Sequence, residues 1–314
     1  MSAETHPLDL TIRAGLELIY EAQVPTTLTL LIKPQAGPWQ SIQSELFSFL
    51  PHVNATEFED THGNLVHRVT VGAGQTSIRH DALVRVPSIR ENHTHIGEVV
   101  PVSELPPDLL RYLLPSRYCD SDKLLDFAFE QFGEVPHGFE RVQAICDWVH
   151  RNIEYRFGGG NAVISASDVI KQRFGVCRDF AHTAIALCRT FNLPARYVTG
   201  YVPDVAFTDP GTPMDFHAYF EVYIGHQWHV FDARFNTPRI GRILIARGRD
   251  AVDGAFATAY GAAKLVWFNV WAYQVDPADV KVGDPIDLSK RLDGTPELRL
   301  PPAAAASFGE AQAA

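Results

Sequence analysis

Alternating apolar and polar positions in the first hundred residues predict β-strands. Apolar side chains recur at alternate positions in 8–12, 65–71 and 78–86, and residues 27–32 are apolar and β-branched. An alternation of this kind buries one face of a strand and leaves the other face in water. Short strands joined by glycine-containing turns are typical of a small antiparallel sandwich. We therefore expect residues 1–102 to form a β-rich N-terminal domain.

After Leu105 the apolar positions recur at spacings of three and four, which is the period of a helix with one buried face. Ser121 and Ser167 are the expected N-caps of two of these helices. Helices followed by strands indicate an α+β arrangement. We expect residues 103–283 to form a second domain and residues 284–314 to form a partly disordered tail, whose end at 298–314 is rich in Pro and Ala. The predicted helices are 122–132, 139–153, 168–174 and 177–192, and the predicted strands are 195–202, 216–224, 227–234 and 264–275.

The chain carries 37 acidic and 27 basic side chains, which gives a net charge of −10. A negative field of this size repels polyanions, so we expect neither nucleic acid nor a membrane surface as a partner. No apolar run approaches the roughly 20 residues that a membrane-spanning helix needs. The N-terminus also lacks the basic start and apolar centre of a secretory signal. We therefore expect a cytoplasmic protein.

Four cysteines are scattered along the chain, and none belongs to a Cys-x-x-Cys pair. They are too few for a disulfide scaffold and too scattered for a structural zinc site. Cys177 is distinctive because it begins a predicted helix, where free N–H groups and the helix dipole favour a thiolate. The alternative is that Cys177 is a small buried apolar residue. We expect Cys146 and Cys188 to pack in the core, and Cys119 has no distinguishing context.

Two later strands offer a base and an orienting acid for this thiol. A tight turn at 225–226 would pair Ile224 with Gln227. With that register, His217 and Asp232 are diagonal neighbours on one face of a hairpin, within side-chain reach of each other. Taken singly, the histidine could be an ordinary sheet residue and the aspartate a turn former. Together with the thiol, the pair favours a catalytic triad.

A zinc site is another interpretation of this region, because His217, His226, His229 and Asp232 are close in sequence. His229 alternates to the face opposite Asp232, and His226 lies in the turn, so the four side chains would not converge. We therefore expect no metal ion. The histidines of the first hundred residues that we expect on the surface or in the sheets are His52, His62, His67, His80, His93 and His95.

Four stretches of the chain carry a family resemblance: 175–182 (GVCRDFAH), 193–201 (LPARYVTGY), 216–221 (FHAYFE) and 228–232 (WHVFD). Together they resemble the transglutaminase-like superfamily, whose members are relatives of papain-type cysteine hydrolases. Within it the chain is most similar to bacterial transglutaminase-like cysteine proteases, which carry a β-rich domain before the catalytic core. The resemblance is strong over residues 140–240. It implies that 103–283 is a papain-like catalytic core, in which a helix bearing the cysteine packs on an antiparallel sheet.

The resemblance also implies a role for each residue of the triad. Cys177 is the nucleophile that forms a thioester, His217 takes the thiol proton and later protonates the leaving amine, and Asp232 orients His217. The backbone N–H of Cys177 would stabilise the oxyanion, with Tyr155 or Asn161 as the second donor. The sequence contains no calcium loop and no zinc-binding cysteine pair, so we expect no cofactor.

Three further residues are candidates for substrate binding. Tyr219 stands where many family members have tryptophan, and it would shape the pocket. Arg239 and Arg242 belong to a basic run over 234–249 that no acidic residue interrupts. The two arginines could clamp a substrate carboxylate, although salt bridges to the acidic remainder of the chain are the simpler interpretation.

Hydrolysis of a peptide or amide bond through a thioester is the function that the sequence favours. Transfer of the acyl group to an amine uses the same chemistry and is the first alternative. A non-catalytic binding module on the same fold is the second alternative. In the first two cases the expected partner is a peptide or amide substrate.

Overall fold

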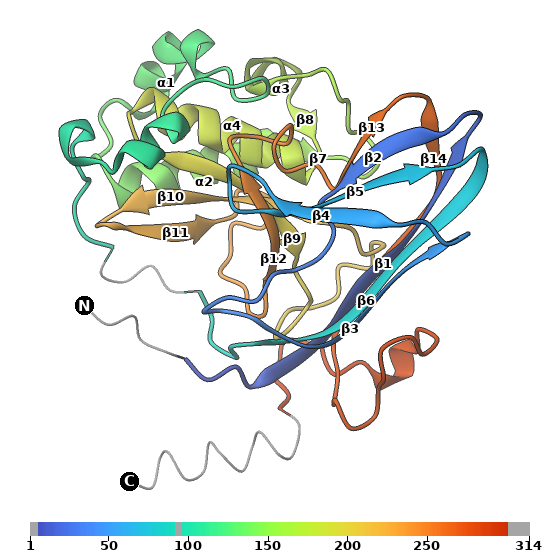
Figure 1. Ribbon diagram of the computed structural model, residues 1–314. Helices are drawn as coiled ribbons and strands as arrows, with labels where there is room; N and C mark the ends of the chain where they lie inside the picture. The colour runs from blue at the N-terminus through green and yellow to red at the C-terminus, as the bar shows by residue number, and fades with distance from the viewer. Residues whose placement is uncertain (1–5, 92–95, 301–314) are drawn as a thin grey trace, which may run out of the picture.

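The computed structural model describes residues 6–91 and 96–300, and it shows a mixed α/β fold with antiparallel sheets (Figure 1). Two four-stranded sheets have the strand orders β14-β1-β6-β3 and β13-β2-β5-β4. Both therefore combine strands from the beginning and the end of the chain. Their strands are β1 (Leu10–Ala22), β2 (Thr26–Leu30), β3 (Ser41–Leu50), β4 (Ala55–Glu59), β5 (Leu65–Val71), β6 (Gly74–Val86), β13 (Ala257–Tyr260) and β14 (Ala263–Gln274).

The two C-terminal strands complete the N-terminal sheets. β14 runs antiparallel to β1 from the pair Ile12–Gln274 to the pair Ala22–Ala263, and β13 pairs with β2. In Figure 1 both strands lie beside the blue strands at the right of the molecule. The sequence analysis assigned these strands to the second domain, so the expected boundaries do not follow the sheets. Pairing between strands so far apart in the chain leaves no local pattern from which it could be predicted.

One apolar core joins these two sheets to the rest of the molecule. It contains Leu16 and Leu18 of β1, Leu28 of β2 and Val69 of β5, all at most 1% exposed, and it continues into Ile243. Because Ile243 begins a strand of the third sheet, the β-rich part and the remaining chain are stabilised by burial of the same apolar side chains.

The third sheet has the order β11-β10-β9-β12, and its neighbouring strands are antiparallel. Helix α4 packs on β9 and β10 and also contacts α2 and α3, so it lies at the centre of a second apolar core. The elements are β9 (Ala195–Tyr201), β10 (His217–Ile224), β11 (Gln227–Phe231), β12 (Ile243–Gly248), α1 (Leu125–Phe132), α2 (Phe139–Asn152), α3 (Ala166–Gln172) and α4 (Cys177–Thr190). Shorter elements are β7 (Glu154–Tyr155), β8 (Phe174–Gly175), η1 (Val102–Glu104), η2 (Pro107–Tyr112), η3 (Ser121–Lys123) and η4 (Leu288–Lys290).

Two helix starts differ from the sequence-based expectation. Helix α3 is capped by Ser165 rather than by Ser167, and the Asp168 carboxylate accepts the N–H of Ser165 in return. Ser167 donates to a loop carboxylate instead. Ser121 lies in η3, and α1 begins at Leu125 without a side-chain cap. Both differences move the start of a helix by a few residues and leave the helix in place.

The C-terminal segment packs against the first sheet. Arg13 of β1 is 1% exposed, pairs with Asp81 of β6 at 2.7 Å and donates to the carbonyl oxygens of Asp284 and Pro285. Residues 301–314 of the expected tail lie outside the described residues, as do His93 and His95. Within the part of the chain that the structure describes, no helix is both long and apolar enough to cross a membrane.

Candidate active site

The chain enters α4 through a close approach between Gly175 and Asp179. Strand β8 ends at Gly175, and α4 begins at Cys177. The Asp179 carboxylate accepts a hydrogen bond from the N–H of Val176 at 2.9 Å, which caps the helix. A Cβ atom at position 175 would lie 2.7 Å from the Cβ of Asp179. Glycine is therefore required beside the capping carboxylate, and this local arrangement sets where Cys177 begins its helix.

The Cys177 side chain is partly exposed, and its sulfur faces the start of β10. The thiol donates to the carbonyl oxygen of Phe216 with an Sγ–O distance of 3.8 Å, and the N–H of Ala218 donates to the sulfur. The sulfur thus contacts the peptide groups on both sides of His217.

The surroundings of the sulfur keep it protonated. Burial by neighbouring protein atoms raises the pKa of the Cys177 thiol to about 12, and the carboxylates of Asp215 and Asp232 act in the same direction. The N–H groups of Ala218 and Arg178 lower this pKa, but they do not outweigh burial. The N–H of Arg178, in the first turn of α4, thus acts in the direction expected of a helix start, while burial acts against it. A base must remove the proton before the sulfur can attack.

The hairpin of β10 and β11 has the register that the sequence predicts, with Ile224 paired to Gln227. Residues 225–226 both have positive φ, which is the geometry of a two-residue type I′ turn. With this register the side chains of His217 and Asp232 meet, and the distance from Nε2 to Oδ2 is 2.8 Å.

Asp232 is buried and has four polar contacts, of which three are hydrogen bonds and one is an ion pair. Its Oδ1 accepts the N–H groups of Arg234 and Phe235 at 3.0 and 3.1 Å. Its Oδ2 lies 2.8 Å from His217 Nε2 and 2.9 Å from Arg242 Nη2. Burial alone would raise the pKa of this carboxyl, but His217 and Arg242 outweigh burial and hold the pKa well below its usual range. Asp232 is therefore ionised. Because Asp232 contacts Nε2 of His217, Nδ1 is the ring nitrogen that does not contact this carboxylate.

The two candidate oxyanion donors differ in position. Tyr155 pairs with Gly175, two residues before Cys177, and burial raises the pKa of its hydroxyl. The guanidinium of Arg234 covers the Tyr155 ring at 3.7 Å. The Asn161 side chain instead accepts a backbone N–H in its own turn, and the Asn161 carbonyl accepts a hydrogen bond from Arg178. The geometry thus favours Tyr155 over Asn161.

The three candidate substrate-binding residues are buried. Tyr219 is 3% exposed, Arg239 is 2% exposed and the Arg242 side chain is 7% exposed. Arg239 pairs with Asp204 at 2.9 Å, and Arg242 pairs with Glu91 and covers the Tyr219 ring at 4.6 Å. A carboxylate clamp needs accessible guanidinium groups, so the structure contradicts it. Salt bridges within the chain, the simpler interpretation, account for both arginines.

Asp215 is a carboxylate that acts electrostatically on the thiol, and the sequence analysis did not identify it as a candidate. It is half-buried, and its Oδ1 accepts the N–H of Phe216 at 2.7 Å. Burial raises its pKa and the charge of His217 lowers it. Among the described residues its electrostatic partner is therefore His217 rather than a lysine or an arginine. Its position two residues before the histidine is the signal that could have found it.

The side chains of the zinc interpretation point to different places. His229 Nε2 lies 3.2 Å from the carbonyl oxygen of Ile224, near the turn of the hairpin, whereas Asp232 contacts His217 beyond its open end. Over the ranges 6–91 and 96–300, no three His, Cys, Asp or Glu side chains are grouped so as to hold a metal ion.

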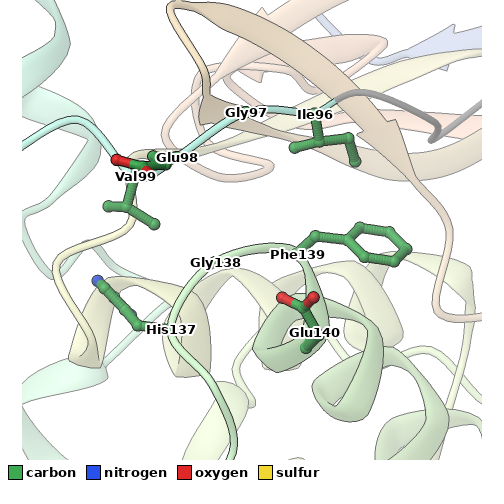
Figure 2. A pocket seen from close by; sticks show the side chains of 8 residues that line it. All are labelled: Ile96, Gly97, Glu98, Val99, His137, Gly138, Phe139 and Glu140. Carbon is green, nitrogen blue, oxygen red and sulfur yellow. The ribbon is translucent and has the colours of Figure 1, made fainter.

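A hollow of about 600 Å³ lies in front of α2 and is lined by residues 96–99 and 137–140. Figure 2 shows these two segments facing each other, with the side chains of Glu98 and Glu140 among those that line the space. None of the lining residues belongs to the group around Cys177, so we do not assign this hollow to the candidate site.

Comparisons with known proteins bear on this geometry. The model of the transglutaminase-like superfamily matches residues 126–233, a span that includes Cys177, His217 and Asp232. The crystal structure of a "Putative Cysteine Protease" from Cytophaga hutchinsonii is 36% identical in sequence and has a TM-score of 0.78. The match covers 85% of this chain and 91% of the Cytophaga chain. The similarity therefore extends well beyond the segment that the family model matches.

Two mycobacterial proteins without an assigned function are also similar. The chain is 28% identical to a Mycobacterium leprae protein over 116 residues and 29% identical to a Mycobacterium tuberculosis protein over 147 residues. These matches cover 36% and 42% of this chain, and 42% and 45% of the mycobacterial proteins. The matched region is thus less than half the length of these curated relatives.

Proposed function

Because this chain belongs to the transglutaminase-like superfamily, we propose that it hydrolyses peptide or amide bonds through a thioester on Cys177. The observation that carries the proposal is the contact of the Cys177 sulfur with both peptide groups that flank His217, whose Nε2 is hydrogen-bonded to Asp232. The three residues come from the start of α4, the start of β10 and the end of β11. A thiol, an imidazole and a carboxylate in this order can activate a nucleophile.

In the proposed first step His217 acts as the base. A thiol with a pKa of about 12 holds almost no thiolate at neutral pH, so the proton passes to Nδ1 as the sulfur attacks the substrate carbonyl carbon. Asp232 stabilises the imidazolium that forms. The carbonyl electrons move onto oxygen, and we assign the stabilisation of this oxyanion to the first N–H groups of α4 and to the Tyr155 hydroxyl.

The remaining steps return the enzyme to its starting state. The imidazolium gives its proton to the leaving amine, the C–N bond breaks and the acyl group stays on the sulfur. A water molecule then loses a proton to His217 and attacks the thioester carbonyl. The C–S bond breaks, the carboxylic acid leaves and the sulfur takes the proton back. Asp232 stays ionised throughout, since its pKa lies far below neutral pH.

Transfer to an amine is the second candidate, and Asp215 favours it. The Asp215 carboxylate is half-buried and acts electrostatically on both Cys177 and His217. A carboxylate in such a position attracts an ammonium group. In this reaction an amine, after losing its proton to His217, attacks the thioester in place of water, and the product is a new amide.

Alkylation of the thiol tests the nucleophile without knowledge of the substrate. Cys119, Cys146 and Cys188 are at most 1% exposed, whereas Cys177 is partly exposed. Iodoacetamide should therefore label a single cysteine in the native protein. We expect labelling of Cys177 at pH 7 to be at least about tenfold slower in His217→Ala, because the base is gone. Peptide mass spectrometry locates the label and measures its rate.

The matched control is His229→Ala, which removes an imidazole from the adjacent strand at the far end of the hairpin. This variant should be labelled at the rate of the unaltered protein. If His217→Ala leaves the labelling rate of Cys177 unchanged, the enzymatic proposal fails and a binding module is favoured.

Product analysis separates hydrolysis from amine transfer. The protein is incubated with a mixture of peptides in the presence and absence of dansylcadaverine, a fluorescent primary amine. We expect new peptide termini without the amine, and none in Cys177→Ala. Dansylated peptides without new termini would instead support amine transfer, and Asp215→Asn should then lower dansyl incorporation.

A further inference from the structure

Arg242 contacts the same carboxylate oxygen as the proposed catalytic histidine. It lies immediately before β12, and its side chain is 7% exposed. Its Nη2 is 2.9 Å from Asp232 Oδ2, and His217 Nε2 is 2.8 Å from that oxygen. The guanidinium also lies over the ring of Tyr219. A buried cation thus contacts the same carboxylate oxygen as the imidazole and limits the orientation of Asp232.

Arg242 is itself held by Glu91, a residue that follows β6 in the N-terminal part of the chain. Glu91 accepts hydrogen bonds from Arg242 Nε and, at 3.5 Å, from Nη2. The Glu91 backbone N–H donates to the carbonyl oxygen of Arg239 at 3.1 Å, and its carboxylate accepts the N–H of Arg239 at 3.0 Å. Three hydrogen-bonding groups of Glu91 therefore fix the turn that presents Arg242 to Asp232.

The charges of Asp232, Arg242 and Glu91 contribute to the electrostatic potential at the His217 imidazole. Asp232 carries one negative charge, Arg242 one positive charge and Glu91 one negative charge, so the group carries a net charge of −1 toward His217. In a buried site, the gain or loss of one nearby charge shifts the pKa of a titratable side chain by about one unit or more. Arg242 weakens the attraction of Asp232 for an imidazolium, and Glu91 partly restores it.

Other charged and titratable groups also face His217. Cys177 approaches it from α4, Asp215 from the preceding loop and Tyr219 from its own strand. Asp232 contacts it from the end of β11. All of these residues are kept in the Glu91 and Arg242 variants, and two of them, Asp232 and Tyr219, contact Arg242 directly.

We infer that Arg242, anchored by Glu91, is a positioning residue that fixes Asp232 and sets the pH range in which His217 holds a proton. The inference rests on the proposed function, because it assigns His217 the role of base. A structural salt bridge between the N-terminal segment and the third sheet is the alternative. Such a bridge would affect the melting temperature and leave the titration of the imidazole unchanged.

The pH dependence of Cys177 alkylation distinguishes the two roles. The rate of Cys177 alkylation is measured from pH 5 to pH 10. The limb of this pH–rate profile that is absent in His217→Ala reports the loss of a proton from the imidazole. We expect Arg242→Gln to move this limb to higher pH by about one unit, because the whole charge of Asp232 then acts on His217. We expect Glu91→Gln to move it in the opposite direction, because the Arg242 charge is no longer offset.

Two further variants control for loss of folding. Arg242→Lys keeps the cation and should leave the limb in place while it lowers the alkylation rate, because the forked contact with Glu91 and Asp232 is lost. Arg247→Gln removes another arginine of this sheet, whose partner Glu221 retains Arg196. It should change the melting temperature without moving the limb.

Opposite shifts in Arg242→Gln and Glu91→Gln support the inference. Shifts of the same sign, or no shift in either folded variant, would overturn it and leave a structural salt bridge. If Arg242→Gln does not fold, the Glu91→Gln shift alone decides. An unaltered protein whose Cys177 is unreactive would instead contradict the proposed function, so the two failures are distinguishable.

Discussion

Asp232 receives two backbone and two side-chain donors, and this explains how a buried carboxylate stays ionised. Transfer of a charge out of water is costly unless hydrogen bonds and opposite charges compensate for it. Here the backbone N–H groups of Arg234 and Phe235 bind Oδ1, and His217 and Arg242 both contact Oδ2. The same residue is therefore a turn former at the end of a strand and the proposed partner of the base.

Replacement of this carboxylate should change stability in a pH-dependent way. The pKa of Asp232 is lower in the folded chain than its ordinary value of 3.8, so its contribution to stability is present above about pH 4 and is lost as the pH falls below that value. We expect Asp232→Asn to destabilise the protein at pH 7 by about 3 kcal/mol, since it leaves the buried Arg242 guanidinium without its anion on this side.

Differential scanning calorimetry at several pH values checks this prediction. The difference in melting temperature between Asp232→Asn and the unaltered protein should narrow as the pH is lowered from 7 to 3. A difference that stays constant over this range would show that the charge of Asp232 does not contribute to stability.

The sequence could identify the three residues of the candidate triad but not the surroundings of the carboxylate. His217 and Asp232 are joined by a short turn, so their register follows from local rules. Glu91 and Arg242 are 151 positions apart, and no local pattern connects them. For the same reason, the basic run around Arg242 suggested a substrate clamp, whereas its charges are used within the fold.

At the scale of elements, the start of α4 depends on one close packing contact. Asp179 folds back to cap the helix, and Gly175 leaves room for it. The cap and the glycine together hold the first turn of α4 against β8, with Cys177 at its beginning. Movement of this turn by a fraction of an ångström would alter the contact between the sulfur and the start of β10.

We expect Gly175→Ala to destabilise the protein by about 1–3 kcal/mol, because the added methyl group overlaps the Asp179 side chain. It should also slow the alkylation of Cys177. Gly72→Ala is the control, since a Cβ there meets no atom within 4 Å, and its effect should stay within about 0.5 kcal/mol. Urea denaturation of both variants measures the difference, and equal stabilities would contradict the packing argument.

The helices and the strands of the third sheet follow the apolar periodicity more closely than the outer strands do. β4 is exposed at every position, and β3 has no buried position. Both lie at the edge of a sheet, where backbone hydrogen bonds to a single neighbour define the strand and neither face is fully buried. Such strands lack the alternation that a sequence analysis detects, which is why the sequence did not predict them.

At the scale of the whole molecule, the β-rich part and the part that carries the candidate site are interdependent. β13 and β14 return to the first two sheets after the chain has formed the third. The apolar core around Leu16 and Leu18 includes Ile243 of the third sheet, and Glu91 holds Arg242 beside the candidate triad. The N-terminal part is thus a structural component of the site's surroundings.

The shared apolar core and the two returning strands predict a single cooperative unfolding transition. Far-UV circular dichroism, which reports the strands, and tryptophan fluorescence should give the same midpoint in urea. The calorimetric and van't Hoff enthalpies should also agree. Two separate transitions would show that the β-rich part unfolds independently of the remainder.

The position of β14 beside β1 also has a consequence for biosynthesis. Without β14 and β13, β1 and β2 are edge strands, and their unpaired backbone groups can bind other chains. A ribosome must translate the chain as far as residue 260 before β13 can cover β2, and as far as residue 274 before β14 can cover all of β1. During most of its synthesis the nascent polypeptide therefore lacks the strands that cover these two edges, which is the state in which pairing with other chains is favoured.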